Sequence, residues 1–342
     1  VTKKPFDSEG MVTGFTVKGN YGDFREEWTP TVSGLFSDRW ETGIGEFGFL
    51  ISASSQEMKT RGDRIGVANY YSRGTATDGS VDGPALTNQA PGTVLWMPGQ
   101  ASIATAENDR ERDGLASSLQ WQNTDETIIA TVEYIRSKAS LTWTERVIGQ
   151  QAQGFTISEM VAINTDVNKS VFDENGFFVS GDVTGGPLLL STRWNETINE
   201  VEDGSFHLTL KPSDRLTLDF DYQRVDSTSE LNNYALNGRS FATAQTLDLS
   251  SDTPYTSYSS SLNNPNTGIY SNDYVLRSMM EHNAYNDGTA DSYQFDAKYE
   301  IDDNWLTGVS AGLYYSDKDL TVRDTEYSNW QAVTCGWWGC GD

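Results

Sequence analysis

A strict two-residue alternation is the feature that most limits what this chain can fold into. In residues 292–302, SYQFDAKYEID, the residues Tyr293, Phe295, Ala297 and Tyr299 share one parity, and polar or charged residues occupy the other. Side chains of a strand point alternately to opposite faces. The stretch LTLDFDYQ at 216–223 repeats the pattern, whereas helical periodicity is weak. The sequence therefore predicts an all-β chain whose strands have one apolar and one polar face.

The predicted connections between strands alternate in length. Short turns are expected near 38–45, 123–126, 212–215 and 302–304, and much longer links near 61–110, 140–193 and 228–291. Successive connections of an up-and-down sheet emerge at opposite ends, so one end would carry tight turns and the other large loops. This arrangement is typical of outer-membrane barrels, whereas long structureless loops are uncommon in compact soluble domains.

The fold class predicted from these two patterns is an antiparallel up-and-down transmembrane β-barrel. Hydrocarbon offers no hydrogen bonds to a backbone, so a β structure spans it only when closed. The apolar parity would then face lipid and the polar parity a wet lumen. The residues expected to face the lumen are His207, Asp219, Asp221, Gln223, Gln294, Asp296 and Lys298.

Charge narrows the range of partners. Lys and Arg total 24 against 49 Asp and Glu, a formal net charge of -25. Such a chain repels phosphate backbones, so nucleic acid is not an expected partner. No apolar run approaches the roughly 20 residues of a membrane-spanning helix.

Reactive groups are sparse in the sequence. His207 and His282 are the only histidines, and the pattern of a nucleophile elbow or a phosphate-binding glycine loop does not occur. A glycosidase would need a carboxylate pair such as Asp219 with Asp221 or Asp296, but lumen lining already accounts for their parity. We expect no catalytic residues, no enzyme activity and no cofactor.

The two cysteines lie close together, in the segment TCGWWGCGD. Cys335 and Cys340 are placed to close a local disulfide in an oxidising compartment, worth about 2 kcal/mol by loop entropy. No other Cys or His lies near enough in sequence to complete a four-ligand metal site, so no metal is expected.

Aromatic residues in the predicted long loops suggest a binding function. Flat aromatic faces beside amide and carboxylate groups suit a sugar-like ligand. The candidate ligand-binding residues are Trp96, Trp143, Trp194, Tyr255, Tyr258, Trp330, Trp337 and Trp338.

The sequence resembles the TonB-dependent outer-membrane receptors, in particular their Caulobacter-type subgroup. VTKKPFD at the start is similar to the junction between plug and barrel, and SGLFSDRWETGIGEFGFLISASSQ, RERDGLASSLQW and DDNWLTGVSAGLYYSDKD are similar to barrel hairpins of that group. The resemblance implies active uptake of a nutrient, an oligosaccharide rather than a siderophore or other metal chelate. It also implies a Gram-negative outer membrane as location, with surrounding lipid and the TonB-ExbB-ExbD energy-coupling complex as partners.

The same resemblance suggests how the chain is organised. Residues 1–9 would be the plug-to-barrel junction and residues 10–342 the N-terminal portion of the barrel. About nine strands are expected, whereas the family closes its barrel with twenty-two, and TonB box, plug and aromatic-ended final strand are not found. We therefore expect a fragment that reaches its partner complex through a plug outside this sequence.

Two other classes of protein remain open. One is a soluble β-rich carbohydrate-active enzyme or carbohydrate-binding module, and the other a passive porin or adhesin barrel. The soluble class requires a second protein layer over Leu218, Phe220, Phe295 and Tyr299, whereas a membrane barrel leaves these residues uncovered.

Overall fold

The computed structural model describes residues 3–75, 89–151, 162–163, 170–260, 274–301, 305–326 and 329–332. Apart from one short 3-10 helix, its regular structure is antiparallel β-strand. The elements are η1 Pro5–Asp7, β1 Val12–Gly22, β2 Glu27–Thr42, β3 Gly45–Thr75, β4 Val94–Gln122, β5 Ile128–Gln151, β6 Ala162–Ile163, β7 Ser170–Phe172, β8 Phe178–Ser213, β9 Leu216–Asp248, β10 Tyr255–Ser260, β11 Tyr274–Glu300, β12 Gly308–Asp324 and β13 Asn329–Ala332.

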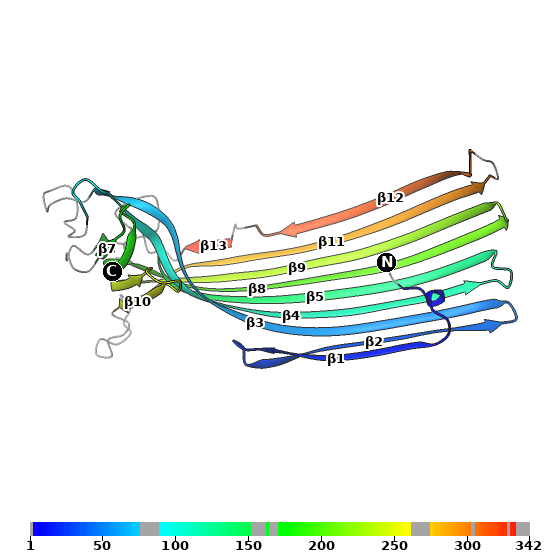
Figure 1. The fold of residues 1–342 in the computed structure, drawn as a ribbon, viewed down its shortest axis with the longest axis horizontal. Helices are drawn as coiled ribbons and strands as arrows, with labels where there is room; N and C mark the ends of the chain where they lie inside the picture. The colour runs from blue at the N-terminus through cyan, green and yellow to red at the C-terminus, as the bar shows by residue number, and fades with distance from the viewer. Residues whose placement is uncertain are drawn as a thin grey trace.

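Nine long strands form a meander in chain order. The sheet runs β1-β2-β3-β4-β5-β8-β9-β11-β12, and the short strands β6, β7, β10 and β13 pair at its margins. This confirms the expected nine-strand up-and-down sheet with tight turns at one end (Figure 1); the turn expected near 302–304 lies outside the described residues. The sheet is open, with β1 and β12 at its two edges. A closed barrel is therefore not shown.

The strands are much longer than expected. β8 has 36 residues and β9 has 33, so most of the links predicted at 61–110, 140–193 and 228–291 are strand. The prediction of very long loops was wrong there, because it took loss of apolar alternation as the end of a strand. A strand polar on both faces still satisfies its backbone through pairing with its neighbours.

The pairing registers place the two parities on opposite faces throughout the sheet. Directly paired residues share a face. One row of pairs crosses eight strands as Trp40, Phe47, Trp121, Ala130, Leu208, Phe220, Phe295 and Leu313. We call the face that carries this row the apolar face and the other the polar face.

The N-terminal segment lies on the polar face near the tight turns. Phe6 N donates a hydrogen bond to Gln120 Oε1 at 3.2 Å, and the guanidinium of Arg39 lies 5.0 Å from the Phe6 ring centre. A Cβ on Gly48 would lie 2.5 Å from the Cβ of Pro5. A larger residue at position 48 would therefore push this segment off the sheet.

The main buried core lies at the opposite end, where the sheet folds into a small cap. We define the cap as the far ends of β3, β4, β8 and β9 together with β7 and β10; these strands curl away from the sheet at the left of Figure 1. Its buried residues are Leu95, Met97, Ala101, Phe172, Phe178 and Leu247. The cap therefore has an apolar interior of its own, whereas the sheet between cap and turns is a single layer (Figure 1).

Candidate membrane-facing surface and ligand-facing residues

A continuous apolar band covers the apolar face next to the tight turns. On each of seven strands the band consists of a short segment, which we call a window. Its outward residues, which are those on the apolar face, are mainly apolar. The windows are 47–53 on β3, 115–121 on β4, 128–134 on β5, 204–210 on β8, 216–222 on β9, 293–299 on β11 and 309–315 on β12. At about 3.3 Å per residue each window is about 20 Å long. Each window contains slightly fewer residues than the 9–11 that are typical of a membrane-spanning strand.

No second layer covers this band within the described residues. Phe220 is 37% exposed, Phe295 43% and Tyr299 46%, and Leu313 on the edge strand is 77% exposed. Leu218 is half-buried by its neighbours. The side chains that a sandwich would bury are thus open on one side.

The apolar band crosses the strands obliquely. Phe47 is the first residue of its window on β3, but its row meets β12 at Leu313, the third outward residue of that window. The row of Ala53, the last in the β3 window, meets β12 at Asp319, beyond the end of the band. The band keeps the same width but shifts along the strands from β3 to β12. The strands are therefore inclined to the band. Strands of membrane barrels are inclined to the membrane in the same way.

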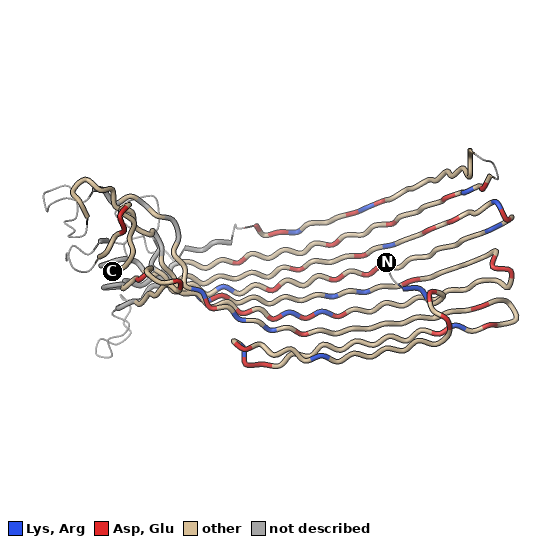
Figure 2. The backbone as a smooth tube through the Cα atoms, viewed as in Figure 1, with Lys and Arg blue, Asp and Glu red and all other residues tan. Residues whose placement is uncertain are grey.

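Charged residues replace the apolar ones on the same face directly beyond the band. Tyrosines stand at the boundary: Tyr134 Oη donates to Glu202 at 3.0 Å, and Tyr222 Oη donates to Asp291 at 2.8 Å. Acidic residues, with Lys or Arg at some positions, are found along the middle of the strands (Figure 2). We call this zone the charged belt. Its ion pairs are Arg136 with Glu200 and Glu202, Arg224 with Asp226 and Asp291, and Arg323 with Asp287.

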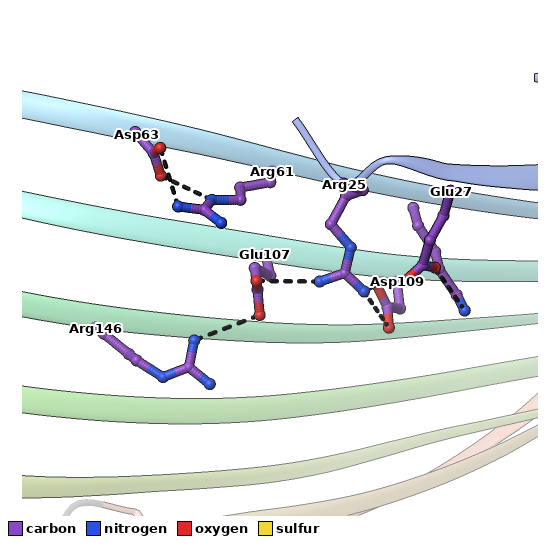
Figure 3. Close-up of polar contacts among 8 residues, drawn as sticks. Arg25, Glu27, Arg61, Asp63, Glu107, Asp109 and Arg146 are labelled. Atoms are coloured by element: carbon purple, nitrogen blue, oxygen red, sulfur yellow. Dashed lines mark hydrogen bonds and ion pairs between the residues drawn. The ribbon is translucent and has the colours of Figure 1, made fainter. Parts of the chain in front are cut away.

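The belt continues toward β1 in a cluster drawn in Figure 3. Arg25, in the turn between β1 and β2, reaches Glu107 at 3.2 Å and Asp109 at 3.1 Å on β4. Glu107 also pairs with Arg146 at 3.4 Å. The Arg25 side chain is only 15% exposed, the lowest among these cations. This turn is therefore fixed to β4 by charge.

Two further pairs complete this part of the belt. Lys59 contacts Glu27 at 3.2 Å and Arg61 contacts Asp63 at 2.9 Å (Figure 3). The hydrogen bonds from Arg61 hold the pKa of the Asp63 carboxyl below its usual value. Hydrogen bonds to Glu57 and Glu27 raise the pKa of Lys59. Both groups thus stay charged across the neutral range.

The seven residues predicted to face a lumen share the polar face. His207 contacts Asp221 through Nδ1 and Thr209 Oγ1 through Nε2, the latter at 3.0 Å. Thr209 donates to Asp219 at 2.6 Å. The other contacts are Gln223 to Asp203 at 2.7 Å, Gln294 to Asp296, and Lys298 to Glu300 at 3.0 Å. The common face follows from the structure; that it lines a lumen stays a prediction.

The predicted loop aromatics fall into several places. Trp143 and Trp194 are not in loops, because β5 and β8 extend through them. They lie on opposite faces: Trp143 packs under Arg193, whose guanidinium is 5.4 Å from the ring centre, and Trp194 stacks on Tyr234 at 5.6 Å. Tyr255 and Tyr258 lie in β10 and Trp330 in β13. Trp337, Trp338, Cys335 and Cys340 lie outside the described residues.

Trp96 lies in a group of three aromatic rings on the cap. It lies in the cap beside Phe177, and Tyr70 meets Phe177 edge-on. Phe177 was not among the candidates. The signals in the sequence were the alternation Leu95-Trp96-Met97 and the pair Phe177-Phe178. In each segment one aromatic side chain reaches the surface, while the apolar residues next to it are buried.

Comparison with known proteins gives no identification. No family model, no curated protein and no solved structure matches this chain. Among the described residues no helix is long and apolar enough to cross a membrane. In the same part of the chain no three His, Cys, Asp or Glu side chains are grouped as metal ligands.

Proposed function

We propose that this chain forms part of the wall of an outer-membrane β-barrel that serves TonB-dependent uptake of a nutrient. The observation that carries the proposal is the uncovered apolar band, which runs obliquely over seven strands and ends at tyrosines and a charged belt. Membrane barrels have such an apolar belt flanked by aromatic girdles, with short turns at the periplasmic end.

The soluble alternative fits this face less well. A β-sandwich packs one sheet on another and buries the residues between them. Here Phe220, Phe295 and Tyr299 remain exposed on the same face, and exposed apolar patches of more than a few hundred Å² are rare on monomeric soluble proteins. A lipid environment gives these side chains an apolar partner.

The position of the N-terminal segment supports a barrel with a plug rather than an empty pore. Pro5 and Phe6 lie on the polar face, held by Gln120 and Arg39. A domain preceding them would enter the barrel from this side, where a plug sits in the family that the sequence resembles. Coupling to the TonB complex rests on that resemblance.

The membrane part of the proposal is tested by labelling in intact outer membranes. Single cysteines at 293, 295 and 297, and at 294, 296 and 298, are introduced after Cys335 and Cys340 are replaced by serine. The proposal expects a water-soluble maleimide to label the even positions and a lipid-dissolved maleimide the odd ones. Equal labelling of both sets by the water-soluble reagent would exclude a membrane-facing band.

The transport part is tested separately in cells that express the full-length protein. Uptake of a radiolabelled neutral oligosaccharide is compared between cells with and without TonB, and with and without a protonophore. The proposal expects uptake to be lost in both deficient conditions. Uptake that persists without TonB would favour a passive pore.

A further inference from the structure

Three aromatic rings form one exposed surface on the cap. The rings of Trp96 and Phe177 are nearly parallel, at 16°, with centroids 5.9 Å apart. Tyr70 meets Phe177 edge-on, with centroids 5.5 Å apart. Phe177 is 39% exposed and Tyr70 36%, and Trp96 is half-buried. The three side chains thus form one aromatic group that is partly open to solvent beyond the charged belt.

A tight turn holds Phe177 beside Trp96. Trp96 N donates to Gly176 O at 2.8 Å, and Trp96 and Phe177 form an isolated parallel bridge. Asp173 Oδ1 accepts from Asn175 N at 2.9 Å and from Phe177 N at 2.8 Å. Gly176 has φ +83°, and a Cβ there would lie 2.0 Å from Val94 O. Only glycine fits this turn without moving β4.

The cap core supports the rings from below. Leu95, Met97 and Phe178 flank the exposed aromatics in sequence and are 0%, 2% and 2% exposed. Phe178 packs edge-on against Phe172 at 5.7 Å. Rings anchored in this way lose little conformational freedom when a ligand binds, which favours affinity.

The surroundings select the chemistry of the ligand. Asp173 Oδ1 accepts a hydrogen bond from Phe177 N at 2.8 Å, which places a carboxylate beside this residue. Burial, and after it the charge of Asp173, raises the pKa of the Tyr70 hydroxyl. The chain carries a net charge of -25, which disfavours anionic ligands. Flat apolar faces beside a hydroxyl and a carboxylate match the C–H faces and hydroxyl groups of a neutral sugar ring.

We propose that Trp96, Phe177 and Tyr70 form a platform that binds a neutral oligosaccharide through stacking on its sugar rings. The platform lies at the end of the sheet opposite the tight turns. A barrel would expose this end to the external medium. Its biological purpose rests on the proposed uptake function, but its binding activity does not.

The test is calorimetric titration of the purified full-length protein in detergent with three neutral hexasaccharides: maltohexaose, cellohexaose and xylohexaose. At least one is expected to bind. Trp96→Ala and Phe177→Leu should each weaken that binding about tenfold, and Gly176→Ala should weaken it with all three rings retained, because stacking is then misaligned. Trp96→Phe, which keeps a ring, should lose less than Trp96→Ala.

Val171→Ala is the control, since Val171 is also an apolar cap residue and is 46% exposed. It should bind as the unsubstituted protein does. The proposal is overturned if none of the three sugars binds at about 1 mM, or if Trp96→Ala and Phe177→Leu bind as tightly as the Val171 variant. Normal binding together with uptake that does not need TonB would instead overturn only the transport function.

Discussion

The same strands have different surfaces in their two halves. In the near half, between the tight turns and the charged belt, β9 carries Leu216, Leu218, Phe220 and Tyr222 on one face. In the far half, between the belt and the cap, its residues on that face are mostly polar, yet the pairing with β8 and β11 continues. Backbone pairing therefore continues where the apolar residues end, and the side chains distinguish the two halves. The near half presents an apolar face, and the far half presents a mostly polar one.

A charged residue placed in the apolar band is the most direct test of the difference between the two halves. Phe295→Arg puts a cation in the middle of the β11 window. For a band in lipid we expect a loss of about 2–4 kcal/mol in the free energy of unfolding, the cost of Arg near a bilayer midplane. The measurement is urea unfolding of the full-length protein in phospholipid vesicles.

Two arginine substitutions on β11 serve as controls for Phe295→Arg. Gln294→Arg tests the polar face at the same depth, and Thr289→Arg tests the apolar face beyond the band. Both should change the unfolding free energy by less than about 0.5 kcal/mol, as surface substitutions usually do. Equal losses for all three variants would show that the band does not meet lipid.

We expect an ion pair of the charged belt to contribute most to the free energy of unfolding where its side chains are least exposed. Arg25→Ala removes a side chain that is 15% exposed and takes a cation away from Glu107 and Asp109, which lie on the same face of β4. We expect a loss of about 1.5 kcal/mol, at the low end for hydrogen bonds to charged groups because the carboxylates are partly solvated. Thermal unfolding in detergent measures it.

Arg146→Ala is the control within the same cluster. Its side chain is 59% exposed and its contact with Glu107 is 3.4 Å long, so its loss should stay below about 0.5 kcal/mol. If both variants lose the same amount, exposure does not rank the ions of the belt.

At the turn end of the near half, the N-terminal segment gives a local comparison. Gly48→Val would displace Pro5 and Phe6 from the polar face. We expect trypsin to cleave after Lys3 about tenfold faster, as a shift of about 1.4 kcal/mol in docking would produce. Gly62 lies on the same face of the same strand, and a Cβ there would have no atom within 4 Å. Gly62→Val should therefore leave the cleavage rate unchanged.

The sequence predicted the near half well and the far half poorly. Alternation located the strands around 216–223 and 292–301 and the residues that share each of their faces, because one face there is apolar and the period is visible. It ended β5 before Trp143 and began β8 after Trp194, because polar residues on both faces erase that period. Spatial neighbours such as Trp96 and Phe177 are 81 residues apart in the chain, so only the register of the cap strands brings them together. The role of Arg25 was not predicted for the same reason. Its partners Glu107 and Asp109 are far away in sequence, and the turn between β1 and β2 reaches them on β4 across β3.

The far half should instead depend on polar contacts between strands. Ser191 donates to Asn237 Oδ1 at 2.8 Å, and Asn237 Nδ2 donates to Ser278 at 3.1 Å, which links β8, β9 and β11 on the polar face. Both serines are nearly buried, at 8% and 9% exposure. Asn237→Ala should therefore cost about 1 kcal/mol, the usual net value of a hydrogen-bonded group, and speed amide hydrogen exchange in the far half alone. Asn232→Ala, which removes a side chain that donates to Glu230 on its own strand, should leave exchange unchanged; uniform exchange in both variants would mean that backbone pairing holds the far half without this ladder.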